Sequence, residues 1–163
     1  MKVLLAADHE SFNEAIADFV INRSWETNTI FRIVNVVPAI YEYAYASSVP
    51  ELMMDLRADA KNNAGIKVRH MALKLRDHFH LDNIQEVILE GHPAEMLLEH
   101  AEQWHADLII MGSHGRTGLK KFLMGSVSSA VLDHSPCSVI IVRQKETQVQ
   151  NNEMAKEKVE ARV

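Results

Sequence analysis

The 163-residue sequence has a single cysteine, few glycines and no long apolar run. With Cys137 alone, neither an internal disulfide nor a cysteine-ligated zinc site can form, and a reducing compartment is expected. No apolar run approaches the roughly 18 residues of a membrane span. The apolar residues before Asp8 are too few for the core of a signal peptide. These absences predict a cytoplasmic protein without a membrane segment.

The sequence also lacks an excess of positive charge. Seventeen lysines and arginines stand against 22 aspartates and glutamates, which gives a formal net charge of −5 at pH 7. Dedicated binders of nucleic acid or anionic membranes need a basic surface, so neither class of partner is expected. Any bound anion must be held by a local group of residues. The apolar fraction of 47% is typical of a globular chain and is enough for one domain with a buried core.

Short apolar runs alternate with helical patterns along most of the chain. The runs lack polar alternation, as in strands buried on both faces, and they span 3–7, 30–37, 87–89, 108–111 and 139–142. Helices are expected at 11–24, 50–80, 93–104 and 127–134. Ser126 is expected to cap the last helix with its hydroxyl. This alternation predicts an α/β fold, a five-stranded parallel sheet with helices on both faces. Residues 144–163 are predicted to form a polar tail, frayed or helical, outside a domain of residues 1–143.

Glycine is concentrated in one place. Four of the six glycines follow the fourth apolar run within a short stretch: Gly112, Gly115, Gly118 and Gly125. Parallel sheets bind ligands at the carboxyl ends of their strands, and glycines let backbone N–H groups converge on an anion. The same stretch contains no acidic residue and three basic ones: Arg116, Lys120 and Lys121. A phosphate-binding loop is therefore predicted, in preference to a surface loop with incidental glycines.

The glycine spacing is specific. It reads Gly112-x2-Gly115-x9-Gly125-Ser126, which fits neither the Walker A pattern nor the Gly-x-Gly-x-x-Gly dinucleotide pattern. It resembles the ATP-binding motif of the universal stress protein family, and the resemblance extends over residues 2–143. The resemblance implies a Rossmann-like three-layer sandwich with strand order 3-2-1-4-5 and a nucleotide between the ends of strands one and four.

The resemblance also implies a set of nucleotide-binding residues. Val36 and Met111 would flank the adenine, with Ala7 and Asp8 near the ribose and base. The ribose and phosphates would lie against Gly112, His114, Gly115, Arg116, Gly125, Ser126, Val127 and Ser128. ATP would carry magnesium or manganese on its phosphates, with no metal ligand or catalytic residue assigned to the chain. The family also implies a homodimer that pairs through the fifth strand, Ser138 to Val142.

One departure from the family and two further features leave alternatives open. Where the family often has Asp-Gly-Ser, this chain has Asp8-His9-Glu10-Ser11. Three tyrosines are spaced by two, so an extended segment would place them all on one side: Tyr41, Tyr43 and Tyr45. They could form a flap over the base or a partner surface, or they could reflect ordinary packing of the loop. His114 could donate to a phosphate or orient a water molecule. Cys137 is expected to be an inert buried thiol, and the methionines and tryptophans are expected to fill the core.

Three functions are compatible with these patterns. The main prediction is a stress-response switch that holds ATP and hydrolyses it slowly at most. The second is an adenine-nucleotide hydrolase-type enzyme, such as an ATP pyrophosphatase. That class has a glycine-containing phosphate loop after strand one, where this chain has Ala6 to Ser11 without glycine. The third is a nucleotide-free dimeric scaffold, which the intact glycine motif disfavours.

Overall fold

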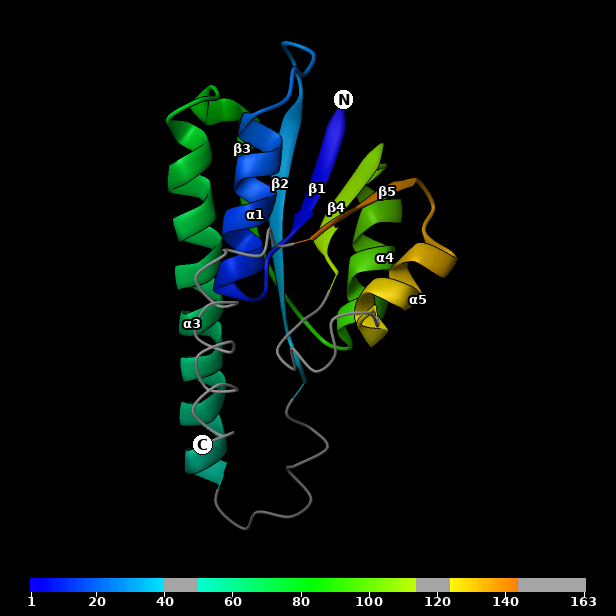
Figure 1. Cartoon of the computed structure of the whole chain (residues 1–163). Helices are drawn as coiled ribbons and strands as arrows, with labels where there is room; N and C mark the ends of the chain where they lie inside the picture. Colours follow the sequence, from blue (N-terminus) through cyan, green and yellow to red (C-terminus); the bar gives the residue numbers. More distant parts are fainter. Residues whose placement is uncertain (40–49, 114–123, 144–163) are drawn as a thin grey trace, which may run out of the picture.

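A computed structural model describes residues 1–39, 50–113 and 124–143. Its five strands form one parallel sheet in the order β3-β2-β1-β4-β5 (Figure 1). The strands are β1 (Lys2–Ala6), β2 (Ile30–Val37), β3 (Ile84–Glu90), β4 (Leu108–Gly112) and β5 (Ser138–Val142). The helices are α1 (Glu10–Ile21), α3 (Pro50–Arg76), α4 (Pro93–Trp104) and α5 (Ser126–His134), with a 3-10 turn at Leu81–Asn83. The predicted α/β class and strand order are confirmed.

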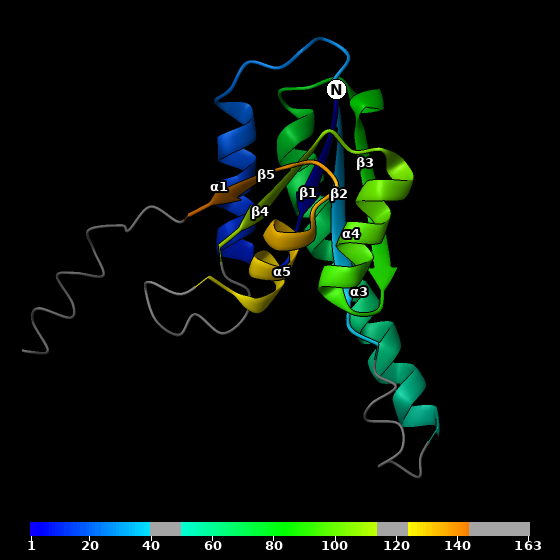
Figure 2. The same cartoon turned by 90° about the vertical axis from the view of Figure 1, so that its right-hand side faces the viewer.

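Helices cover both faces of the sheet (Figures 1 and 2). Side chains alternate across a strand, so neighbouring residues of β1 enter different cores. Val3 and Leu5 are buried with residues of α1 and α3, whereas Leu4 is buried with residues of α4 and α5. The apolar runs therefore have no polar face, as expected for a parallel sheet between two helical layers.

The strand order reverses between β1 and β4, because β2 lies on one side of β1 and β4 on the other. At such a point the connections diverge toward opposite faces and leave an opening at the carboxyl ends of the strands. The two ends of the glycine-rich segment meet there. The Gly125 N–H donates to the Ser113 carbonyl (2.9 Å), and the Ser113 N–H donates to Val142 (3.1 Å).

Some boundaries and burial predictions differ from the structure. β3 begins three residues before its apolar run, since Ile84, Gln85 and Glu86 also pair with β2. The prediction that the methionines fill the core was wrong for Met54, which lies on α3 and is 72% exposed. α3 is the longest described helix, yet neither it nor any other helix of the described segments is both long and apolar enough to span a membrane.

Candidate functional site

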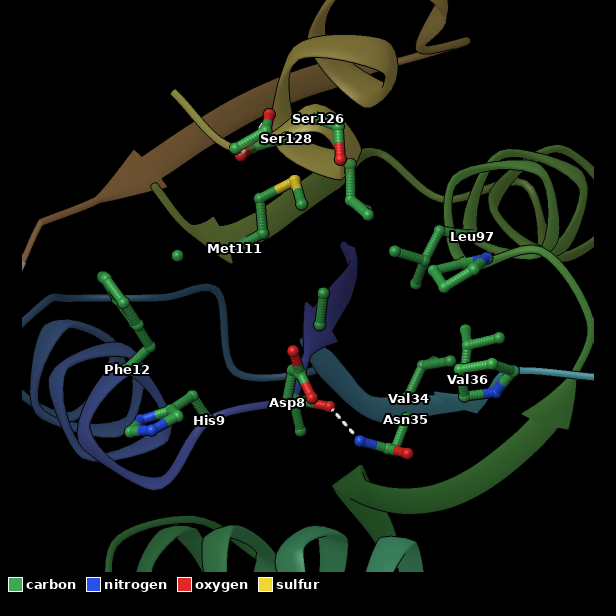
Figure 3. Close-up of a pocket in the computed structure, with 17 residues that line it drawn as sticks. Asp8, His9, Phe12, Val34, Asn35, Val36, Leu97, Met111, Ser126 and Ser128 are labelled. Carbon is green, nitrogen blue, oxygen red and sulfur yellow. Dashed lines mark hydrogen bonds between the residues drawn. The ribbon is translucent and has the colours of Figure 1, made fainter. Parts of the chain in front are cut away.

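A cavity of about 280 Å³ lies at the carboxyl ends of β1, β2 and β4 (Figure 3). Apolar side chains from three elements form much of its wall: Val34 and Val36 of β2, Met111 of β4 and Leu97 of α4. Residues at the start of α5 also line the cavity, with Ser126 and Ser128 on the same side as Met111. An apolar enclosure with a few convergent polar groups is the usual form of a small-molecule site.

All the predicted nucleotide-binding residues that the structure describes line this cavity. They are Ala7, Asp8, Val36, Met111, Gly112, Gly125, Ser126, Val127 and Ser128. The other predicted site residues, His114, Gly115 and Arg116, lie outside the described residues, as do Tyr41, Tyr43 and Tyr45. The fold thus brings together segments more than 100 positions apart in the sequence. The roles of these residues toward a nucleotide remain predictions.

Several lining residues have no signal in the glycine motif. They are Ala6, His9, Phe12, Val34, Asn35, Pro38, Pro93 and Leu97. His9, Pro38 and Pro93 follow strand ends, so the rule that ligands bind beyond the carboxyl ends could have found them. Phe12 and Leu97 lie inside helices, and their presence in the wall depends on how α1 and α4 pack on the sheet.

Asp8 is held at the cavity by two helices. Its backbone N–H donates to Oδ1 of Asn13 in α1 (3.0 Å), and Asn13 is buried. Its carboxylate Oδ1 lies 3.5 Å from Nζ of Lys67 in α3. Asp8 therefore presents an acidic side chain at a fixed place where β1 passes into α1.

Asn35 extends the pairing of β1 and β2 beyond the end of β1. The Ala7 N–H donates to the Val34 carbonyl (2.8 Å), and the buried Asn35 side chain donates from Nδ2 to the Ala7 carbonyl (Figure 3). A side-chain amide thus takes the place of the next backbone donor in the ladder. This hydrogen bond holds the Ala7–Asp8 backbone against β2 at the cavity floor.

The start of α5 differs from the prediction. Gly125 is the N-cap and Ser126 is the first helical residue, so the expectation that Ser126 caps the helix was wrong. Within the part of the chain that the structure describes, no side-chain hydrogen bond caps the N-terminus of this helix. The buried Ser128 hydroxyl instead donates to the Ser113 carbonyl (3.0 Å) and so ties α5 to the end of β4. The first-turn N–H groups and the positive end of the helix dipole are therefore suited to an anion at the cavity.

Three helices begin at the cavity wall, and their first turns differ in charge. α1 carries Glu10 and α4 carries Glu95 in the first turn, whereas the first turn of α5 has no acidic residue. A carboxylate at a helix N-terminus satisfies the same dipole that would attract a phosphate. Of these three helix starts, that of α5 is therefore the best suited to an anion.

The thiol of Cys137 is not part of the cavity wall. Cys137 is half-buried, and burial raises the pKa of its thiol, as expected for an unreactive group. Within residues 1–39, 50–113 and 124–143, no cluster of three or more histidine, cysteine, aspartate or glutamate side chains could hold a metal ion. Asp8 is the acidic member of the described cavity wall.

Comparison with known proteins places this geometry in a family. The model of the Universal stress protein family matches residues 1–143. Universal stress protein MJ0577 of Methanocaldococcus jannaschii is 35% identical over 98 residues, which cover 60% of this chain and 59% of that relative. Universal stress protein MJ0531 of the same organism is 38% identical over 93 residues, 57% of this chain and 52% of that relative. The matched part of the chain thus spans between half and three fifths of these two relatives.

Solved structures share the fold. The structure of MJ0577 has a TM-score of 0.74 at 26% identity, and the match covers 90% of this chain and 97% of that one. An Arabidopsis thaliana family protein with AMP bound has a TM-score of 0.64 at 15% identity, over 90% of this chain and 93% of that one. A universal stress protein in complex with cAMP has a TM-score of 0.60 at 20% identity, over 89% and 98%. At 15% and 20% identity, the AMP-bound and cAMP-bound proteins show only that they share the fold of this chain.

Proposed function

The chain belongs to the universal stress protein family, and we propose on that premise that it binds ATP and acts as a stress-response switch, with slow hydrolysis at most. One observation carries the proposal. The described members of the predicted nucleotide set line a single cavity, and the uncapped start of α5 lies on its wall. The apolar part suits an adenine, and the α5 end suits phosphates.

The ligands of other family members support the class of ligand. An Arabidopsis thaliana protein was solved with AMP and another universal stress protein with cAMP. Both ligands contain adenosine, so the cavity next to Val36 and Met111 is proposed to take the base. Magnesium or manganese would arrive with ATP, because Asp8 is the one carboxylate on the described cavity wall and these ions bind well to phosphate oxygens.

The proposal extends to location and assembly. We place the protein in the cytoplasm as a homodimer that pairs through β5, whose outer side has no partner strand among the described residues. The nucleotide-binding domain would comprise residues 1–143, with 144–163 as a tail.

The enzyme alternative is less well supported. An ATP pyrophosphatase-type site needs a glycine-containing phosphate loop after β1, but here Asp8 and His9 lead directly into α1. Glu10 in the first turn of α1 further disfavours a phosphate at that position. A nucleotide-free scaffold would leave the apolar cavity and the uncapped helix start without a ligand.

Thermal unfolding with and without ATP and magnesium tests the proposal. Ligand at about 100 times its Kd stabilises a protein by roughly 2.7 kcal/mol. For a chain of this size, that corresponds to a rise in Tm of about 5–10 °C. An unchanged Tm at millimolar ATP would contradict binding. Turnover faster than about one per second would favour the enzyme alternative.

A further inference from the structure

The cations of α3 form ion pairs on two sides of the helix. Toward β3, basic side chains meet two glutamates, and these pairs include Lys61–Glu90 and Arg76–Glu86. Toward β1 and α1, Lys74 pairs with Glu14, and Lys67 pairs with Asp8. Among the ion pairs found within the described residues, Lys67–Asp8 is the one that ends on a residue of the cavity wall.

Lys67 is placed to orient the Asp8 carboxylate. Its Nζ lies 3.5 Å from Oδ1, and its side chain is 29% exposed while that of Asp8 is 49% exposed. The Asp8 backbone is already fixed by Asn13, so the ammonium group acts on the remaining side-chain rotation. A carboxylate offers about four acceptor positions, so one that contacts Lys67 can still accept from a ligand hydroxyl or amine.

We propose that Lys67 is a positioning residue for the nucleoside part of the ligand and acts through Asp8. This inference rests on the proposed nucleotide binding. It assigns a role to α3, which contributes no residue to the glycine motif and none to the described cavity wall. Because Asp8 lies at the β1 end of the cavity and not at the start of α5, the effect concerns the nucleoside and not the phosphates.

Titration of the full-length Lys67→Met variant with adenosine and with ATP tests the role. An ion pair of this exposure corresponds to about a twofold to fivefold change in Kd. We expect Lys67→Met to bind both ligands more weakly by this factor, and Lys67→Arg to recover the wild-type Kd. Lys61→Met is the matched control, because it removes a lysine of the same helix whose partner, Glu90, does not line the cavity. Its Kd should equal that of the wild type.

A double-mutant cycle separates positioning from general effects of charge. In an Asp8→Asn background, Lys67→Met should cause no further change in Kd. A wild-type Kd for Lys67→Met, an equal loss in Lys61→Met, or a loss that persists without the Asp8 carboxylate would overturn the inference. A loss seen with ATP but not with adenosine would also overturn it. If the wild type binds neither adenosine nor ATP, the proposed function itself fails.

Discussion

A β-carbon added to Gly112 would lie 2.7 Å from the ring of Phe12. Gly112 ends β4, and Phe12 lies in the first turn of α1, so the ring packs directly on the strand where the glycine-rich segment begins. The backbone of Gly112 is not among those with positive φ. Glycine is therefore needed at this position because a side chain would collide with the Phe12 ring. This reason holds whether or not a phosphate also approaches the Gly112 backbone.

Gly112→Ala should destabilise the protein through this contact. Overpacking of a core contact costs about 1–3 kcal/mol, which corresponds to a fall in Tm of roughly 3–10 °C for a chain of this size. In a Phe12→Ala background, the same substitution should cost much less, because the ring that it meets is absent. Thermal unfolding of the four proteins measures the difference. An equal cost in both backgrounds would mean that Phe12 is not the reason for glycine.

Gly91→Ala should be destabilising for a different reason. Gly91 has φ of 142°, which L-residues rarely adopt, and an added β-carbon would lie 2.8 Å from Cγ of Met96. Backbone strain of this kind costs about 1–3 kcal/mol. Removal of the Met96 side chain should therefore restore only part of the lost stability. Full recovery in Gly91→Ala/Met96→Ala, measured by urea unfolding, would show that side-chain crowding alone determines this glycine.

Gly65→Ala serves as the opposite case. Gly65 lies inside α3, and the nearest atom to an added β-carbon is Cδ1 of Ile88 at 3.6 Å, an ordinary contact. Alanine in a helix interior is favoured over glycine by about 1 kcal/mol. The variant should raise Tm by roughly 2–4 °C. A lowered Tm would indicate that α3 packs more closely on β3 than the described contacts show.

These glycines show which parts of the fold and the cavity can be predicted from the sequence. The alternation of apolar runs and helical patterns predicts the layered sheet, because strands buried between two helical layers are mostly apolar on both faces. The glycine spacing predicts the α5 side of the cavity. It cannot predict that Phe12 covers Gly112 or that Leu97 reaches the same cavity, because these contacts depend on the angles at which α1 and α4 cross the sheet. The capping error at Ser126 has a similar origin, since its position one residue inside α5 follows from the hydrogen bonds of Gly125 and Ser128.

Stability should fall in mild acid through His100. The Arg32 guanidinium lies 4.0 Å from the ring centre of Trp104, and its Nη1 lies 3.2 Å from Nε2 of His100. Burial, and then the charge of Arg32, lower the pKa of His100 below its ordinary value of 6.5. The unfolded chain therefore takes up this proton more readily than the folded one, so stability is fully present above pH 6.5 and declines as the pH falls below it.

The His100→Gln variant isolates this contribution. Glutamine keeps a polar side chain beside Arg32 but does not titrate. The fall in Tm between pH 8 and pH 5.5 should be smaller in the variant than in the wild type, while other histidines contribute equally to both. Parallel Tm curves over this range would contradict a role for His100.

Two serines of the cavity wall, Ser126 and Ser128, should separate stability from binding. Ser128 is buried, and its hydroxyl donates to the Ser113 carbonyl, so Ser128→Ala should cost about 1 kcal/mol and lower the Tm of the ligand-free protein. Ser126 is exposed at the start of α5 and caps nothing, so Ser126→Ala should leave that Tm unchanged. If phosphates bind at the start of α5, Ser126→Ala should still weaken ATP binding, because its hydroxyl lies on the cavity wall. Thermal unfolding without ligand and titration with ATP give both quantities for each variant. A loss of ATP affinity in Ser128→Ala but not in Ser126→Ala would mean that the phosphates do not contact the Ser126 hydroxyl.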